Sequence, residues 1–190
     1  FNVCIFGNSN KIVTRKGSHK GDLIFTTGPF GYTSVGLDIL LNSKKKKNNL
    51  MKKSLKSVTN PKPRLSYGLK NKKYFTSSMD SSDGLSTTLN EMSKQSRKKF
   101  VINKIPSNID LEVYLKKQKM DLNSAVFHGG EEYEFIFTVP AKYKKIIIKN
   151  AKILKTPIIE IGYVELGKGV YVENNNKTTL LKDLGWKHFK

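Results

Sequence analysis

Two carboxylates and two hydroxyl groups lie together in the segment "DSSDG", which we call the DSSDG loop (residues 80–84). Carboxylate oxygens are ligands that Mg²⁺ prefers, and a serine hydroxyl beside the free N–H groups of a helix start can bind a phosphate. The same residues have a structural interpretation, because Ser82 or Asp83 could cap a helix that begins near Gly84. A cap requires only one acid, so Asp80 stays unexplained by it. Taken alone, the loop slightly favours the cap over a metal and phosphate site.

A second candidate is the segment "HGGEEYE", which we call the Glu-rich turn (residues 128–134). Its two glycines predict a tight turn that leads into a strand. Either the acids lie on the surface of an ordinary hairpin turn, or Glu131 or Glu132 binds polar groups of a ligand that the turn approaches. His128 is more typical of a structural hydrogen-bond donor than of a base, and no second His or Cys nearby suggests zinc.

Arg15 and Trp186 are further candidates, near the two ends of the chain. Arg15 lies in "VTRKGSHKGD", where basic residues and glycines are typical either of solvated charge or of a polyphosphate-binding loop. The closing segment "LGWKHFK" holds the only Trp. Trp186 suits core or interface packing, which is the commoner role, and it also suits stacking on a heteroaromatic ring. The sequence has no Ser-His-Asp set, and a lone Cys4 in an expected strand is a poor nucleophile.

The charge of the chain points first to nucleic acid. Its 190 residues carry 35 Lys and Arg against 15 Asp and Glu, a formal net charge of +20. Only Arg15, Arg64 and Arg97 are arginines, however, and arginine supplies the two-nitrogen fork that reads phosphate and guanine. The lysines spread through Asn- and Ile-rich sequence, and the Lys44 to Lys47 run is typical of a solvated loop. We therefore consider nucleic acid an unlikely partner, whereas the same positive charge would favour an anionic small molecule.

Size and composition predict one domain with a buried core, since 37% of the 190 residues are hydrophobic. No apolar run reaches the roughly 18 residues of a transmembrane helix, and the first residues do not resemble a signal peptide. The single Cys4 excludes an internal disulfide and fits a reducing cytosol, so we expect a cytoplasmic location. The absence of an initiator Met is consistent with a start inside a longer protein.

Periodic apolar residues predict the elements that must position these side chains. Strands and helices alternate without the glycine spacing of a Rossmann fold or a P-loop, which predicts an α+β (mixed α/β) domain. The expected strands cover residues 1–7, 23–28, 98–106, 132–140 and a hairpin within 157–175, and the expected helices lie within 28–43, 84–96, 109–120 and 141–154. In the first helix we expect Leu37, Leu40 and Leu41 on one buried face. Thr33 or Ser34 is its expected cap.

Taken together and in this order, the segments resemble the C-terminal part of the thiamine-monophosphate kinases. This family belongs to the aminoimidazole-ribonucleotide-synthetase superfamily, with selenophosphate synthetase and a hydrogenase maturation protein. The similar stretches cover nearly the whole chain: "TRKGSHKGDLIFTTGPFGYTSVGL", "NPKPR", "MDSSDGL", "GGEEYEFIFTVP", "IGYV" and "GWKHF". A lone "SDGL" would be weak evidence, whereas its combination with "GGEEYE" and a Trp-His-Phe end is specific within the superfamily.

The resemblance implies an ATP- and Mg²⁺-dependent kinase that converts thiamine monophosphate to thiamine diphosphate, built on a mixed sheet flanked by helices. It implies that Asp80 and Asp83 bind Mg²⁺ and that Ser82 and Arg15 contact ATP. Phosphoryl transfer depends on positioning and charge neutralisation more than on covalent chemistry, and the resemblance carries over no catalytic side chain. Beside the other motifs, the DSSDG loop is better explained as a metal and nucleotide site, in which the helix start also faces a phosphate.

The resemblance also implies that Glu132 and Trp186 hold the thiamine substrate. The family often has Asp where this chain has Glu132, which keeps the charge and adds a methylene group. It often has Gly-Asp-Ser where this chain has Gly31-Tyr32-Thr33. An acid is missing there, so Tyr32 has no expected role.

The family's N-terminal half, with several metal-binding aspartates and a "GGD" motif, has no counterpart in the sequence. We expect residues 1–12 to be the end of an N-terminal-domain strand with its connection, and residues 13–190 to be the ATP- and substrate-binding domain. The expected partners are ATP, thiamine monophosphate and the missing N-terminal half, with a homodimer when the protein is complete. Two aspartates cannot hold several metal ions alone, so we expect the isolated chain to be weak or inactive.

Two other functions stay open. The chain could be another small-molecule kinase or synthetase of the same superfamily, which a panel of substrates would reveal. It could also be a basic nucleic-acid-binding module that uses the Lys44 to Lys56 segment. Its binding would then be sensitive to salt and insensitive to Asp83→Ala.

Overall fold

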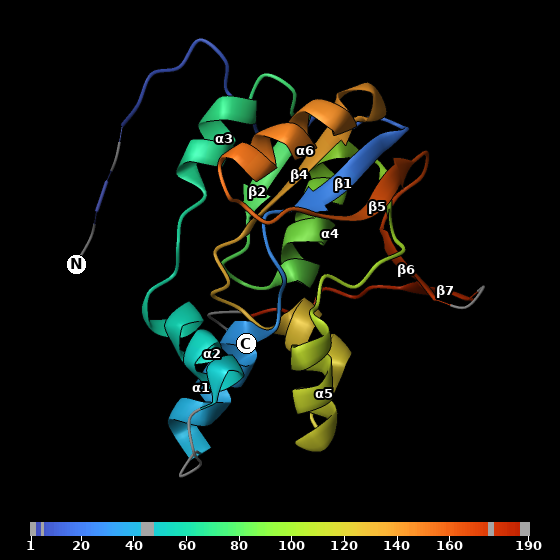
Figure 1. Cartoon of the computed structure of the whole chain (residues 1–190). Coiled ribbons are helices and arrows are strands. Elements are labelled where there is room, and N and C mark those ends of the chain that lie inside the picture. Colours follow the sequence, from blue (N-terminus) through green and yellow to red (C-terminus); the bar gives the residue numbers. More distant parts are fainter. Residues whose placement is uncertain (1–2, 5, 43–47, 175–176, 187–190) are drawn as a thin grey trace.

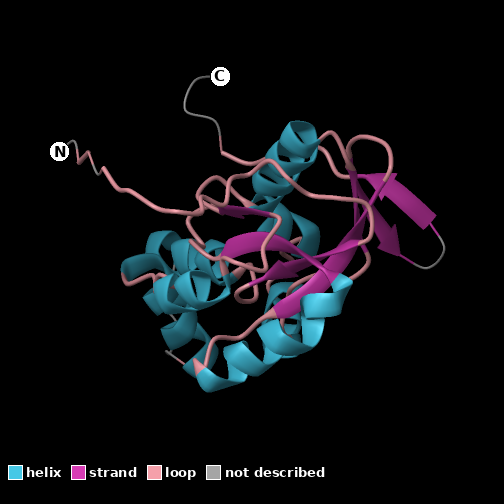
Figure 2. Ribbon diagram, turned by 90° about the horizontal axis from the view of Figure 1, so that it is seen from above, coloured by secondary structure: helices cyan, strands magenta, loops and turns pink. Residues whose placement is uncertain are grey.

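The structure is a computed structural model that describes residues 3–4, 6–42, 48–174 and 177–186. Among these residues, a seven-stranded sheet forms the centre of the fold, with helices on both of its faces (Figures 1 and 2). The strand order is β2-β4-β1-β5-β3-β6-β7, and each neighbouring pair is antiparallel except β3 and β6. This mixed sheet flanked by helices confirms the expected fold class.

The bounds of the elements follow from the chain in order. The strands are β1 (Asp22–Thr26), β2 (Ser77–Asp80), β3 (Lys99–Ile102), β4 (Phe135–Pro140), β5 (Ile159–Glu165), β6 (Val170–Asn174) and β7 (Lys177–Leu180). The helices are α1 (Tyr32–Asn42), α2 (Asn49–Thr59), α3 (Leu65–Asn71), α4 (Leu85–Ser96), α5 (Ile109–Lys117) and α6 (Lys144–Ile153), with short helical turns at Ser124–His128 and Ala141–Tyr143.

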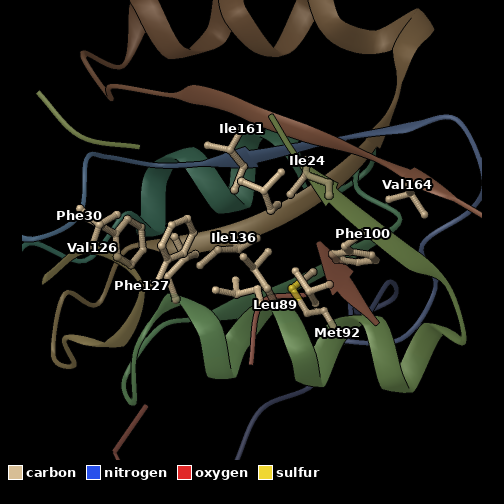
Figure 3. Packing of buried hydrophobic residues seen from close by; sticks show 14 residues of the cluster. Ile24, Phe30, Leu89, Met92, Phe100, Val126, Phe127, Ile136, Ile161 and Val164 are labelled. Atoms are coloured by element: carbon tan, nitrogen blue, oxygen red, sulfur yellow. The ribbon is translucent and has the colours of Figure 1, made fainter. Parts of the chain in front are cut away.

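One face of the sheet is covered by α4, whose residues Leu85, Leu89 and Met92 are completely buried. They recur at helical spacing, which is why this segment folds as an amphipathic helix against the sheet. In Figure 3, Leu89 and Met92 of α4 lie below strand residues that include Ile136 and Phe100. The helix and its buried face are as predicted, and this packing fixes the DSSDG loop that leads into α4 from β2.

The opposite face carries α3 and α6 above an aromatic cluster. Phe25 and Phe137 stack from neighbouring strands with their ring centroids 5.5 Å apart, and Tyr67 of α3 and Ile147 of α6 belong to the same cluster. Strand β4 alternates as predicted, because Phe137 faces this cluster while Ile136 faces α4. The strand that follows the Glu-rich turn is therefore held from both sides.

Helices α1, α2 and α5 pack around a separate apolar cluster, below the sheet in Figure 1. The buried face of α1 recurs at helical spacing and consists of Tyr32, Val35, Gly36 and Ile39, with Thr33 beside them. The expectation that Leu37, Leu40 and Leu41 would be buried is wrong, since they are between 52% and 73% exposed. Gly36 explains the difference, because its missing side chain lets α1 lie directly on the backbone of Ser54 in α2.

Tyr32, for which the sequence suggests no role, ties these three helices together. Its hydroxyl accepts hydrogen bonds from Lys53 Nζ of α2 and from Asn108 Nδ2 before α5, both at 2.9 Å. The Lys53 ammonium also lies 4.0 Å from the centroid of the ring. A buried structural contact therefore stands where the family often has an acid.

Two strand predictions are wrong. Strands β5 and β6 do not form a hairpin, because β3 lies between them, antiparallel to β5 and parallel to β6. Phe100, Val101 and Ile102 of β3 are all buried, which suits a central strand with partners on both edges. At the N-terminus, residues 3–4 and 6–7 lie outside every strand, and Val3 and Phe6 are 84% and 91% exposed. An alternating pattern without a neighbouring strand does not hold a strand, and the domain boundary at residue 12 stays a prediction.

The basic segment after α1 folds in part as a helix that the sequence did not predict, α2. The Lys44 to Lys47 run lies outside the described residues. Within the part of the chain that the structure describes, no helix is both long and apolar enough to cross a membrane.

Candidate functional site

The DSSDG loop connects the end of β2 to the start of α4. Asp80 is exposed and Asp83 half-buried, and with the described residues neither carboxylate makes a hydrogen bond or ion pair. No side chain caps α4, so the expected cap by Ser82 or Asp83 is wrong. The reason is that Gly84, which has no side chain, occupies the cap position. The two carboxylates and the first N–H groups of α4 are therefore left for a ligand.

The Glu-rich turn lies directly against the DSSDG loop. Three backbone hydrogen bonds join them, from Glu131 N to Ser82 O (2.7 Å), from Tyr133 N to Ser81 O (3.0 Å) and from Ser81 N to Glu134 O (3.0 Å). These bonds continue the pairing of β2 with β4 beyond the sheet. The sheet thus brings together two motifs that are far apart in the sequence.

Glu132 caps helix α1 from this turn. Its Oε1 accepts hydrogen bonds from Gly31 N (2.6 Å) and Thr33 N (3.1 Å) at the start of the helix. Thr33 and Ser34, the residues expected to cap α1, lie inside the helix instead. Thr33 Oγ1 donates to Gly130 O (2.8 Å), so the turn and the helix are joined in both directions.

The surroundings of Glu132 favour its neutral form. Burial is the main cause and raises the pKa of Glu132 to about 7, although the two N–H groups of α1 lower it. The negative charge of nearby Glu134 raises the pKa of Glu132 further. A ligand that brings a positive charge or a hydrogen-bond donor to Glu132 would therefore restore its charged form.

Arg15 reaches the same region from the connection before β1. Ser78 N of β2 donates to Thr14 O (2.9 Å), which fixes the residue next to Arg15 on the sheet edge. The same connection is tied to the end of α4 through Ser96 Oγ. The guanidinium lies 3.7 Å from Glu91 Oε1 and stays half exposed.

A groove of about 700 Å³ runs along α4 between this connection and the loop after β5. Arg15 and Asp83 both line the groove, which brings together two residues that the sequence singled out. Lys94, Arg97 and Lys168 line it as well, and the sequence did not single them out. Basic residues are so common in this chain that only the scarcity of arginine could have pointed to Arg97. An anion in the groove would meet several cations beside one carboxylate.

The C-terminal segment ends against the DSSDG loop. Trp186 N donates to Asp83 O (2.9 Å), and Gly185 lies so close to the same carbonyl that a side chain there would overlap it. Asp183 Oδ1 accepts from Thr87 Oγ1 of α4 (2.6 Å), which holds the segment in place. Trp186 is 65% exposed, so the core-packing interpretation of this residue is wrong. Its position beside Asp83 leaves stacking on a ligand ring possible.

His128 has the structural contact that the sequence favoured. Its Nδ1 lies 3.0 Å from the hydroxyl of the buried Ser86 in α4, within hydrogen-bond distance. Burial lowers the pKa of His128, although Asp121 and Asp183 oppose this. A neutral ring bonded to α4 helps to seat the Glu-rich turn.

One charged pair beside the Glu-rich turn was not predicted. Arg64 donates to both oxygens of Glu134, from Nε (2.8 Å) and Nη2 (2.5 Å). Thr27 Oγ1 also donates to Glu134 Oε2 (2.6 Å), and both charged side chains are mostly buried. The bond to Glu134 raises the pKa of Arg64. Two signals could have found the pair, namely the rarity of arginine and the prolines that precede Arg64.

No group of three or more His, Cys, Asp or Glu side chains gathers in a metal-binding arrangement within the described ranges. Asp80 and Asp83 offer unpartnered carboxylate oxygens, which suit Mg²⁺. Mg²⁺ demands octahedral coordination and usually keeps several waters. The donors present therefore fit part of a magnesium site, to which phosphate, water or other protein groups must add.

The chain is similar in sequence to thiamine-monophosphate kinases. No family model matches it. The thiamine-monophosphate kinase of Nitrosopumilus maritimus is 63% identical over 190 residues, which are 100% of this chain and 60% of that protein. That of Aquifex aeolicus is 32% identical over 190 residues, which cover 98% of this chain and 58% of that protein. The chain thus spans about 60% of the length of these curated relatives, in their C-terminal part.

Solved structures agree with the sequence comparison. A structure described as AaThiL complexed with AMPPCP and TMP has a TM-score of 0.79 and 31% identity, over 93% of this chain and 54% of that chain. HypE of E. coli, a hydrogenase maturation protein, has a TM-score of 0.68 at 15% identity, over 96% of this chain and 54% of that chain, which shows the fold alone. The fold is therefore that of the aminoimidazole-ribonucleotide-synthetase-like proteins.

Proposed function

We propose that this chain, which corresponds over its whole length to the C-terminal part of the thiamine-monophosphate kinases, supplies the nucleotide- and substrate-binding part of such a kinase. The reaction would transfer a phosphoryl group from ATP to thiamine monophosphate and give thiamine diphosphate. The observation that carries this proposal is the direct hydrogen bonding of the DSSDG loop to the Glu-rich turn and to Trp186 N. The motifs that resemble the family form one continuous surface in this fold.

Asp80 and Asp83 are the groups that would hold Mg²⁺, because both carboxylates are without a partner among the described residues. When bound, Mg²⁺ neutralises part of the negative charge of the phosphates. Ser82 lies between the two aspartates, next to the uncapped start of α4. Its hydroxyl and the N–H groups of α4 are donors that suit a phosphate oxygen.

The groove along α4 suits the polyphosphate of ATP. A nucleotide bound there would lie between the Arg15 guanidinium and the Asp83 carboxylate. Lys94, Arg97 and Lys168 would add positive charge around it. A solved relative is described as a complex with AMPPCP and TMP, which supports binding of ATP and thiamine monophosphate by this chain as well.

Glu132 and Trp186 suit the thiamine part of the substrate. Thiamine carries a positively charged thiazolium ring and an aminopyrimidine ring, which offers both a donor and an aromatic face. Both backbone bonds of Glu132 use Oε1, so the amino group could bind Oε2. The exposed indole of Trp186 could stack on either ring.

Part of the metal site would come from outside this chain. Asp80 and Asp83 alone do not complete the coordination of Mg²⁺, and the relatives are longer than this chain. We therefore propose that the segment corresponding to the rest of these relatives supplies further ligands, in a protein that is a homodimer when complete. The cytoplasmic location stays a prediction.

The test is a kinase assay on the purified complete protein with ATP, Mg²⁺ and a panel of phosphate acceptors. Formation of thiamine diphosphate that is lost in Asp83→Ala would support the proposal. Phosphorylation of another compound, with thiamine monophosphate ignored, would instead assign a different activity of the same superfamily. The 190-residue chain assayed alone should form little product, and robust synthesis by it would refute the proposed division of the site.

The nucleic-acid alternative finds little support in the basic segment on which it depends. Lys53 of α2 is committed to the Tyr32 hydroxyl and ring rather than held open for a phosphate. Salt-sensitive binding of DNA or RNA that persists in Asp83→Ala would restore this alternative.

A further inference from the structure

The Glu-rich turn contains a strained stretch of backbone at its centre. Glu131 and Tyr133 have φ angles of 63° and 51°, in the left-handed region that residues other than glycine seldom occupy. Glu132 lies between them. A conformation of this kind persists only where the surrounding contacts determine it, and such stretches cluster at functional sites. The question is which contacts hold this one.

Hydrogen bonds on both sides of the strained residues supply part of the answer. Glu131 N and Tyr133 N are bonded to the DSSDG loop, and Glu132 Oε1 is bonded to the start of α1. Each of these bonds is made by the turn itself, with a backbone that would otherwise relax to negative φ. They define the strained shape without anchoring the end of the turn.

Glu134 anchors that end, where the turn passes into β4. Its carboxylate is bound by Arg64 through two nitrogens and by Thr27 Oγ1 at 2.6 Å. Thr27 Oγ1 also accepts a hydrogen bond from Phe135 N (2.9 Å), so the same hydroxyl holds the side chain of one residue and the backbone of the next. The side chain of Glu134 is only 11% exposed, so its charge depends on these partners.

Arg64 is placed for this contact by its own segment. It follows Pro61 and Pro63, whose fixed φ angles stiffen the connection from α2, and it precedes the first residue of α3. Its side chain is 20% exposed and reaches across to β4. The connection between two surface helices thus delivers one guanidinium to the base of the Glu-rich turn.

We infer that Arg64 is a positioning residue for substrate binding: by holding Glu134, it keeps the strained residues 131–133 in place and thereby holds the Glu132 carboxylate at the start of α1. The inference rests on the proposed role of Glu132 toward the thiamine substrate. Arg64 itself touches none of the residues proposed to bind ATP, Mg²⁺ or thiamine monophosphate.

Removal of Arg64 would leave Glu134 as an unpaired carboxylate in a mostly buried position. Such a group moves toward water, and the end of the turn would move with it. The strained residues would relax, and Glu132 would leave the N–H groups of α1. Lysine would preserve the charge but not the two-nitrogen geometry, so it should rescue the function only in part.

The experiment compares Arg64→Ala, Arg64→Lys and the control Lys144→Ala in the complete protein. Lys144 forms a 2.6 Å ion pair with Glu160 at the start of α6, remote from the turn, and its loss measures the general effect of breaking one ion pair. We expect Arg64→Ala to raise KM for thiamine monophosphate about tenfold or more, with KM for ATP and kcat changed by less than about threefold. Arg64→Lys should lie between it and the wild type, and Lys144→Ala should match the wild type.

Hydrogen–deuterium exchange of the same proteins gives a readout that does not depend on activity. Peptides that cover residues 29–36 and 128–135 should exchange faster in Arg64→Ala, while other peptides stay protected. An equal effect of Arg64→Ala and Lys144→Ala on KM for thiamine monophosphate, or unchanged exchange at both peptides, would overturn the inference. If Arg64→Ala fails to fold, Arg64→Lys decides by the same two measurements. If the unaltered protein ignores thiamine monophosphate, the proposed function fails and the exchange data alone decide the inference.

Discussion

Replacement of Glu132 by glutamine tests the charge state of the candidate substrate-binding carboxyl group. The pKa of Glu132 is raised from 4.5 to about 7, mainly by burial. A raised pKa in the folded state stabilises the fold below the unfolded-state pKa, and this contribution is lost as the pH rises to the folded-state pKa. We therefore expect the free energy of unfolding of the wild type to fall, relative to Glu132→Gln, as the pH rises from 4.5 to 7.

The expected size follows from the shift. At about 1.4 kcal/mol per pH unit, the full shift corresponds to roughly 3 kcal/mol, and the partial exposure of Glu132 reduces this to about 2 kcal/mol. Glutamine is a matched control, since its side-chain oxygen can still accept from Gly31 N and Thr33 N but cannot ionise. Urea unfolding of both proteins between about pH 5 and pH 8 measures the difference. A difference that stays constant, or that grows in favour of the wild type with rising pH, would refute the pKa and its cause.

The same pair of proteins separates substrate binding from folding. If the charged form of Glu132 binds the thiamine cation, the affinity of the wild type for thiamine monophosphate should rise with pH and level off above about 7. In Glu132→Gln only the titration of the ligand's own phosphate should remain. Calorimetric titration at each pH measures both affinities, and parallel pH profiles would show that Glu132 does not recognise the substrate by its charge.

Three further substitutions test other parts of the site and fold. Asp80→Asn should lower the Mg²⁺-dependent activity of the complete protein about a hundredfold or more, and an unchanged rate at limiting Mg²⁺ in a kinase assay would contradict the metal role of Asp80. Tyr32→Phe removes the acceptor of two hydrogen bonds, one from the Lys53 ammonium, and should cost about 1–3 kcal/mol in urea unfolding while KM for both substrates is unchanged. Gly36→Ala places a methyl group against the backbone of Ser54 and should destabilise the protein by about 1–3 kcal/mol or more, measured by thermal unfolding.

The elements that local pattern determines were predictable from the sequence. Helix α4 has one apolar stripe that includes Leu85 and Leu89, and its burial against the sheet requires no other information. Strand β4 is similar, because its alternation decides which face meets α4 and which meets α3 and α6. The convergence of the DSSDG loop and the Glu-rich turn follows from these two elements, since β2 and β4 are neighbours.

What the sequence could not predict depends on contacts between distant segments. The buried face of α1 is set by the approach of α2 to Gly36, so Leu37 lies outward although its spacing fits a buried stripe. The insertion of β3 between β5 and β6 follows from the need to cover both edges of an apolar strand, which no local pattern reveals. The Arg64–Glu134 pair is of the same kind, since neither residue has a periodic signal.

The cap of α1 links the helical layer to the candidate site through a single carboxylate. A helix start needs an acceptor, and the family resemblance places the substrate-binding acid in the Glu-rich turn; in this fold Glu132 serves the helix with Oε1. The partial positive charge at the start of α1 favours the ionised form, while burial opposes it, and the two effects leave a pKa of about 7. A cationic substrate would tip that balance toward the carboxylate, which would strengthen the cap as well as bind the substrate. Substrate binding and the seating of α1 on the Glu-rich turn should therefore stabilise each other, because both depend on the same charge.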